Sequence, residues 1–422
     1  MKFSFLKEIM LQHKSSFCYI VIFALSLISP ATVSASHNRF FNVQSIDTMK
    51  YSRDMARDQG ASKDFTRIID AQVKQIADTG ATHIAIATPY DEEFVPFLTS
   101  WVQAARKYKL KVWFRGNFSG WEQWFNYPRI SQEKHTELIT SFITNNTILF
   151  EDGDVFTSCP ECENGGPGDP RKTGDVEGYR EFLISEYKAT QNAFKSISKN
   201  IIANYYSMNG DVAELVMNKD TTAKLGGVVT IDHYVLTPER LNNDINNIAE
   251  KSGGKIVLGE FGAPIPDIHG DMTEKDQEAW LKDLLMRISQ NKNIIGVNYW
   301  TSHGSSTELW SEDNKQKLGV QTLKAYYRPK NIHGIVTDNI GRKLSDVTVT
   351  VDGHVFSTDK KGRYNAIFVD TDKPITFSKL GYIYKKIEKS SIQNDVTNIT
   401  LYPKKPSLLE YILHLFFSIL RK

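Results

Sequence analysis

The stretch Lys255-Ile-Val-Leu-Gly-Glu-Phe-Gly-Ala263 decides how the rest of the chain is interpreted. Its apolar run is long enough for one fully buried strand, and it stops abruptly at Gly259, Glu260 and Gly262. A carboxylate at the end of a buried strand is costly unless a partner or a ligand uses it. In a (β/α)8 barrel the carboxyl ends of the strands carry the catalytic groups. Glu260 is therefore a candidate catalytic residue; the alternative is a glutamate paired with a neighbouring basic side chain.

Strand and helix patterns alternate on both sides of this stretch. Eight buried strands are expected, and segments with one apolar face at helical spacing separate them. The strands are predicted at 40–46, 83–88, 111–115, 150–157, 200–206, 227–234, 255–263 and 294–300. Eight repeats in about 290 residues predict an α/β fold of the (β/α)8, or TIM, barrel type over residues 36–330. A doubly wound open sheet is the alternative, but no GxGxxG follows the first strand.

The pattern changes near Arg328-Pro-Lys330. Residues 331–404 contain short alternating segments, separated by turn signals such as Asp352-Gly353 and Lys361-Gly362, and no helical period. The expected strands are 333–336, 347–351, 355–357, 364–368 and 375–377. This segment is predicted to be a small all-β sandwich domain.

The N-terminal segment indicates export. Lysines precede an apolar core from Cys18 to Ile28, and Val33-Ser34-Ala35 is a suitable cleavage site, so residues 1–35 are predicted to be a signal peptide. An uncleaved anchor is the alternative. With either segment the body of the protein is expected outside the cytoplasm, secreted or at the cell surface.

The C-terminal segment, residues 405–422, is strongly apolar between basic flanks. The run Leu408–Leu420 is shorter than the roughly 17 to 25 residues of a spanning helix. An interfacial helix at a membrane surface is favoured. The alternatives are self-association and docking on the chain's own sandwich.

The composition of the 422 residues is that of a globular protein, with 41% hydrophobic and 24% charged residues. The net charge of +2 gives no indication of a nucleic-acid partner. We find no cofactor motif and no metal-binding constellation, and expect neither group. Cys159 and Cys162, in Cys-Pro-Glu-Cys, are too few for a structural zinc site, so a local disulfide or two buried thiols are expected.

Polar and aromatic residues follow the predicted strands. Two carboxylates beside a bond and rings stacked on sugar faces are what glycosidic cleavage requires. The candidate substrate-binding residues are Arg115, Asn117, Trp121, Asn204, His233, Tyr234 and Trp300. The candidate catalytic residues are Glu260, Glu161 and Glu163.

Glu260 in Gly-Glu-Phe-Gly, the His233-Tyr234 pair and Trp300 together resemble glycoside hydrolase clan A, most closely the family 5 cellulases and mannanases. The resemblance implies a retaining glycosidase that acts on a polysaccharide or oligosaccharide. It implies that Glu260 is the nucleophile and that a glutamate after the fourth strand is the acid/base. The chain departs from the usual Asn-Glu-Pro at that place, because it has Pro160-Glu161 and Cys162-Glu163 instead.

The departure leaves Glu161 and Glu163 both open as the proton donor. Glu161 is favoured because it lies nearer the end of the strand and is better fixed there. The other glutamate is then expected to contact substrate or to hold Arg115. A disulfide between Cys159 and Cys162 is expected to hold the turn at Glu161 stiffly.

The small domain resembles the carboxypeptidase regulatory-like β-sandwich. The resemblance rests on His333-Gly-Ile-Val-Thr-Asp-Asn-Ile-Gly341, on the segments 344–349 and 357–364, and on Phe377-Ser-Lys-Leu-Gly-Tyr382. It implies an accessory spacer or contact module.

Two hypotheses from other classes remain. The barrel is a catalytically inactive glycan-binding protein of the cell surface, or the chain is an envelope assembly or adhesion protein. The loss of Asn-Glu-Pro favours the first. Carboxylates kept after two opposed strands favour an enzyme over both.

Overall fold

The computed structural model describes residues 39–60, 62–369, 373–389 and 395–405. The predicted signal peptide and the apolar run Leu408–Leu420 lie outside these residues. In the part of the chain that is described, no helix has the length and apolarity needed to cross a membrane.

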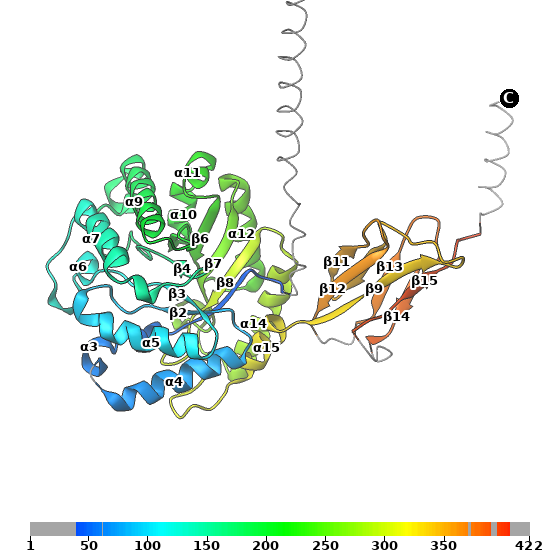
Figure 1. Ribbon diagram of the computed structural model, residues 1–422, viewed down its shortest axis with the longest axis horizontal. Coiled ribbons are helices and arrows are strands. Elements are labelled where there is room, and N and C mark those ends of the chain that lie inside the picture. Colours follow the sequence, from blue (N-terminus) through cyan, green and yellow to red (C-terminus); the bar gives the residue numbers. More distant parts are fainter. Residues whose placement is uncertain (1–38, 61, 370–372, 390–394, 406–422) are drawn as a thin grey trace, which may run out of the picture. The chain divides into compact units, whose positions relative to one another are not determined.

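Eight parallel strands form one curled sheet in the order β4-β3-β2-β1-β8-β7-β6-β5 (Figure 1). The first strand pairs with both the second and the eighth. An isolated parallel bridge joins Val155 of the outer strand β4 to Ile202, which lies before the other outer strand β5, and there the N–H of Phe156 donates to the carbonyl of Ile202 (2.9 Å). This arrangement is consistent with the predicted barrel. The strands are β1 Val43–Asp47, β2 His83–Ile86, β3 Lys111–Phe114, β4 Val155–Phe156, β5 Ser207–Asn209, β6 Val228–Asp232, β7 Lys255–Phe261 and β8 Ile294–Tyr299.

Amphipathic helices follow most of these strands and cover the sheet (Figure 1). In the first long helix, Phe65, Ile69, Val73 and Ile76 recur at helical spacing and are buried, and the Ser62 hydroxyl caps the first turn. The longer helices are α4 Lys63–Asp78, α5 Val95–Lys107, α7 Gln132–Asn145, α9 Val176–Ser196, α12 Pro238–Ser252, α14 Glu274–Gln290 and α15 Leu318–Tyr327. The shorter ones are α2 Met49–Ser52, α3 Ala56–Gln59, α6 Ser119–Glu122, α8 Pro170–Thr173, α10 Gly210–Val216, α11 Lys219–Lys224 and α13 Pro266–His269.

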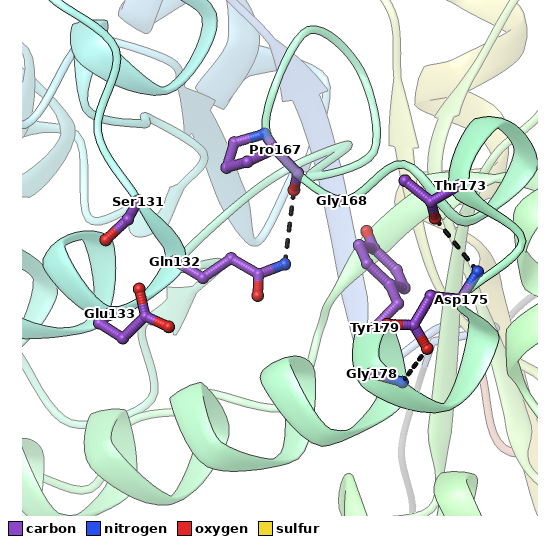
Figure 2. A pocket seen from close by; sticks show the side chains of 9 residues that line it. All are labelled: Ser131, Gln132, Glu133, Pro167, Gly168, Thr173, Asp175, Gly178 and Tyr179. Atoms are coloured by element: carbon purple, nitrogen blue, oxygen red, sulfur yellow. Dashed lines mark hydrogen bonds between the residues drawn. The ribbon is translucent and has the colours of Figure 1, made fainter.

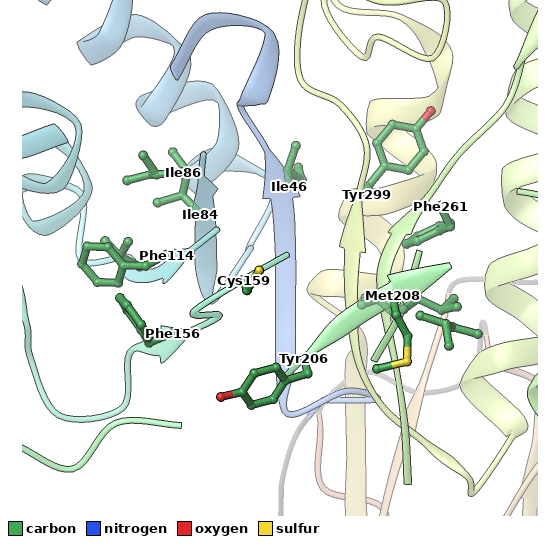
Figure 3. Close-up of a cluster of buried hydrophobic side chains, with 14 of the residues drawn as sticks. Ile46, Ile84, Ile86, Phe114, Phe156, Cys159, Tyr206, Met208, Phe261 and Tyr299 are labelled. Atoms are coloured by element: carbon green, nitrogen blue, oxygen red, sulfur yellow. The ribbon is translucent and has the colours of Figure 1, made fainter. Parts of the chain in front are cut away.

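Strand residues are buried on both faces of the sheet. On β3, Val112 and Phe114 belong to the large cluster that includes helix residues, whereas Trp113 belongs to a separate cluster with Val257 of β7. Strand side chains of the large cluster are drawn in Figure 3. Two-sided burial explains why these strands appear in the sequence as continuous apolar runs.

The fourth and fifth strands differ from the prediction. The expected strand 150–157 is reduced to two residues because 151–153 form a turn in which Gly153 has φ +87°. The expected strand 200–206 makes only the bridge at Ile202, and the ladder with β6 begins at Ser207. The true end of β5 is therefore Asn209, three residues later than predicted.

The described residues of 330–369, 373–389 and 395–405 include the strands of two small sheets. One has the order β11-β10-β13-β14 and the other β12-β9-β15. Their buried side chains, among them Val336, Val349 and Phe377, form a cluster of their own, as expected for two packed sheets. The strands are β9 Lys330–Asp338, β10 Thr348–Val351, β11 His354–Ser357, β12 Arg363–Phe368, β13 Ile375–Ser378, β14 Lys385–Ile387 and β15 Ile399–Leu401.

Candidate active site

Arg115 lies at the centre of the candidate site. It follows β3 two residues after Trp113, so its side chain points to the interior of the curled sheet, where it is fully buried. Its Nη2 atom donates to Glu260 Oε1 (2.7 Å) and to Asp232 Oδ2 (3.0 Å), and its Nε lies 3.5 Å from Asp47 Oδ2. One guanidinium thus draws together three carboxyl groups from β1, β6 and β7.

A β-bulge turns Glu260 towards this centre. Ile231 pairs with Leu258, but the next residue, Asp232, pairs with Glu260, so Gly259 is an extra residue in β7. Without the bulge, Glu260 would face outward with Leu258. A Cβ atom on Gly259 would lie 2.3 Å from Asp232 Oδ1, so only glycine fits there.

Two donors hold the Glu260 carboxylate. Arg115 donates to Oε1, and the hydroxyl of Tyr234 donates to Oε2 (2.9 Å). The Tyr234 ring makes an edge contact with Trp300, with 6.0 Å between the ring centroids. Glu260 is 6% exposed, so its charge is almost out of contact with water.

Burial and like charge work against ionisation in this cluster. Burial, with the negative charge of Asp232, raises the pKa of Glu260 to about 8, although Arg115 opposes the shift. Burial also raises the pKa values of Asp232 and Asp47, again against the effect of Arg115. One cation thus faces three acids, and burial and mutual repulsion oppose the simultaneous ionisation of all three.

Glu161 lies in the loop after β4, next to this cluster. Its N–H donates to the carbonyl of Ser207 at the start of β5 (2.8 Å), and its φ of +46° is uncommon for a residue with a side chain. Burial, with the negative charges of Asp232 and Glu260, raises the pKa of Glu161 well above its usual range. A half-buried carboxyl with a raised pKa is suited to act as a proton donor.

Glu163 is fully buried and is used by its neighbours. Its Oε1 accepts hydrogen bonds from the N–H and the side-chain amide of Asn209 (2.7 and 3.0 Å), and its Oε2 accepts one from Tyr179 (3.3 Å). Burial raises the pKa of Glu163 to about 7. Of the two expectations for the second glutamate, contact with substrate or a bond to Arg115, the second is wrong, because Glu163 ties the loop to the end of β5 and Arg115 binds Glu260 and Asp232.

Of the two states predicted for Cys159 and Cys162, a local disulfide or two buried thiols, the structure has the disulfide. The bond closes a four-residue loop with Glu161 inside it, and both cysteines are buried. The side-chain amide of Asn117 donates to Cys159 Sγ (3.6 Å).

The structure brings four predicted residues together: Glu260, Arg115, Tyr234 and Trp300. Trp121 and Asn117 are buried beneath the loop that follows β4, where they contact Cys162 and Cys159, and are not exposed at the site. Trp121 is fully buried, stacks on Phe182 and donates from Nε1 to the carbonyl of Cys162 (3.0 Å). Asn117 is hydrogen-bonded to His135 (2.7 Å).

Two predicted residues point elsewhere. His233 Nε2 is hydrogen-bonded to Asp244 of α12 (2.9 Å), and only the backbone N–H of His233 reaches Glu260, at its carbonyl. Asn204 precedes β5 and donates to the carbonyl of Gly226, which precedes β6. It lies at the amino ends of the strands, because the fifth strand begins later than its sequence suggested.

Sequence reasoning missed Asp47, Asp232, Asn298 and Asn209 as site residues. Asp47 follows the first predicted strand directly, so the rule that identified Glu260 also applies to it. Asn298 lies on β8 and faces the interior of the curled sheet. Its side-chain amide donates to Asp47 (3.1 Å) and to the carbonyl of Gly259 (2.8 Å). No sequence signal separates Asn298 from an ordinary strand residue.

A cavity of about 320 Å³ opens beside the loop that follows β4, at Pro167 and Gly168, and Glu260 is not part of its lining. It lies between the first turns of α7 and α9 and the segment at Gly168, and Tyr179, the partner of Glu163, forms part of its wall (Figure 2). Among the residues that the structure describes, no cluster of three or more His, Cys, Asp or Glu could hold a metal ion.

The chain matches no protein-family model and no curated protein. Solved structures to which this chain is similar include a β-glucuronidase from Bacteroides uniformis, with 11% identity and a TM-score of 0.47 over 85% of this chain and 46% of that chain. Another is a β-glucuronidase from Dictyoglomus thermophilum, with 16% identity and a TM-score of 0.46 over 68% of this chain and 50% of that chain. The chain thus spans about half the length of these enzymes.

Proposed function

We propose that the protein is a glycosidase that cleaves O-glycosidic bonds of a polysaccharide or oligosaccharide by double displacement with retention. Glu260 is the nucleophile, and Glu161 is the acid/base. The observation that carries the proposal is the difference between the two carboxyl groups. Glu260 is held by two donors, Arg115 and Tyr234, whereas Glu161 lies in the neighbouring loop without these donors and has a pKa that burial and the charges of Asp232 and Glu260 raise.

Each group has a defined part in the reaction. Glu260 attacks the anomeric carbon while Glu161 protonates the leaving oxygen, and Glu161 then takes a proton from the water that releases the sugar. Arg115 and Tyr234 orient the Glu260 carboxylate, and the Trp300 ring offers a face for a sugar. Retention requires carboxyl groups about 5–5.5 Å apart, and a gap of about 6.5–9.5 Å would give inversion.

We also propose that the enzyme acts outside the cytoplasm. The Cys159–Cys162 disulfide supports this proposal, because such bonds persist in oxidising compartments. The sandwich is proposed to be an accessory module of the carboxypeptidase regulatory-like type.

The test is hydrolysis of a panel of β-glucans, mannans, xylans and galactans by the mature protein and by Glu260→Gln. We expect cleavage of one class and a loss of at least about 1000-fold in the variant. Glu133→Gln, an exposed glutamate at the start of α7, is the matched control and should remain active. Binding of a glycan without cleavage by the wild type would instead favour an inactive glycan-binding barrel.

A further inference from the structure

An apolar patch on the sandwich has no role in the reaction proposed above. It comprises Leu380, Ile383 and Tyr402, which are 99%, 55% and 56% exposed. We call these three residues the edge patch. Single exposed apolar residues are ordinary, but a group of them marks an interaction surface.

Backbone pairing places Ile383 and Tyr402 side by side. Tyr382 forms an antiparallel bridge with Pro403, and the N–H of Ile383 donates to the carbonyl of Tyr402 (2.8 Å). In this register Ile383 lies opposite Tyr402, so their side chains are neighbours on one face. Tyr382 alternates to the other face and packs against the sandwich core.

Leu380 lies at the tip of a tight turn. The N–H of Tyr382 donates to the carbonyl of Lys379 (3.1 Å), and Gly381 takes the positive φ of +82° that the turn requires. The turn thus exposes the Leu380 side chain fully to solvent.

Positive charge surrounds the patch. Residues 379–387 contain Lys379, Lys385 and Lys386, and residues 401–405 contain Lys404 and Lys405, with no acidic residue in either segment. Lys386 is paired with Glu388, and Lys404 and Lys405 are exposed. A partner must therefore accept apolar side chains and carry negative charge at the same surface.

We propose that the edge patch docks on an anionic lipid surface. Tyrosines and aliphatic side chains enter the interface between head groups and acyl chains, while lysines are attracted to anionic head groups. The apolar run that begins at Leu408 is six residues beyond Tyr402, so at most about 20 Å of chain separates them. Both segments can reach the same bilayer.

The positive charge around the edge patch argues against two other occupants, a second copy of the chain and the chain's own C-terminal segment. A second copy would bring the same lysines against this surface. The chain's own C-terminal segment is flanked by Lys404, Lys405, Arg421 and Lys422, with Glu410 as its single acidic residue. Anionic lipid is complementary to the patch and to these flanks together.

The first test uses the mature full-length chain and vesicles of phosphatidylcholine with or without about 30% phosphatidylserine. Leu380→Ser with Ile383→Ser should lower partitioning onto the anionic vesicles at least fivefold. Val355→Ser with Val396→Ser is the matched control, because these valines are 68% and 57% exposed elsewhere on the sandwich. It should stay within twofold of the wild type.

A second measurement reports insertion of the turn directly and keeps the rest of the patch intact. Leu380→Cys carrying an environment-sensitive fluorophore should shift to the blue on anionic vesicles, whereas labelled Val355→Cys should not. The proposal is overturned if the wild type does not bind, if the patch variant binds equally, or if the label at position 380 remains in water. A patch variant that changes only the size of the protein in solution would point to self-association and would also overturn it.

Discussion

At the scale of single residues, two neighbouring glutamates have different fates because of what surrounds them. Glu163 accepts three hydrogen bonds and is sealed from solvent, whereas the Glu161 carboxyl is half-buried and makes none of those contacts. A buried carboxyl committed to its neighbours is structural, whereas a carboxyl without such partners and with a raised pKa is available for proton transfer.

This difference predicts how the two glutamine variants respond to the leaving group. Glu161→Gln should lower turnover of natural glycosides about 100- to 10,000-fold, but much less for aryl glycosides whose leaving group needs no protonation. Glu163→Gln should affect both substrates equally and modestly, because it weakens the tie to Asn209. Steady-state kinetics on the two substrates decide the matter. A leaving-group dependence in Glu163→Gln would assign the acid/base to that residue.

Asp232 predicts a pH effect with a definite sign. Its negative charge opposes ionisation of Glu260, so Asp232→Asn should lower the pKa of Glu260. The limb on which kcat/KM rises with pH should therefore move to lower pH, by about one unit. Asp244→Asn is the control. Asp244 lies on α12 and its carboxyl is bound to His233, so this variant should leave the rising limb of kcat/KM in place. A shift of the limb to higher pH would contradict the account.

At the scale of elements, the loop after β4 depends on a short crosslink. The disulfide closes only four residues, so its entropic contribution to stability is about 2 kcal/mol. Its larger effect should be on Glu161, whose left-handed backbone lies inside the loop. Cys159→Ser with Cys162→Ser should lower kcat at least about tenfold, while the loss of about 2 kcal/mol lowers the unfolding temperature by only a few degrees. The reductant dithiothreitol should reproduce the loss in the wild type and have no effect on the variant; full activity after reduction would refute the role.

Helices and strands with a continuous or periodic apolar pattern could be predicted from the sequence. Strands whose ends depend on hydrogen bonding to a neighbouring strand could not. The strand at Leu258 and the helix at Ile69 were found because burial on both faces, or on one, leaves a periodic signal. The fifth strand was placed too early because the aromatic run before Ser207 has strand-like composition but lacks a ladder. Asn204 was consequently assigned to the wrong end of the sheet. Likewise, Arg115 meets Asp47 only because the sheet curls, which residue spacing does not encode.

At the scale of the whole molecule, the sandwich has its own buried cluster, which shares no member with the clusters of the curled sheet. Phe377 is fully buried in it, so Phe377→Ala should cost about 3–5 kcal/mol of sandwich stability. Calorimetry should show one transition lowered and another unchanged, with glycosidase turnover at 25 °C within twofold of the wild type. Equal loss of both transitions would mean that the sandwich and the barrel unfold as one unit.

The central claim is that Glu260 forms the covalent bond to the sugar. The most direct measurement is the intact mass of the protein after incubation with a 2-fluoro glycoside of the sugar it cleaves, because fluorine at that position slows release of the glycosyl-enzyme. The account predicts a mass increase of one glycosyl unit, located on the peptide that contains Glu260 and absent in Glu260→Gln. An adduct on Glu161, or turnover with inversion and no adduct, would contradict it.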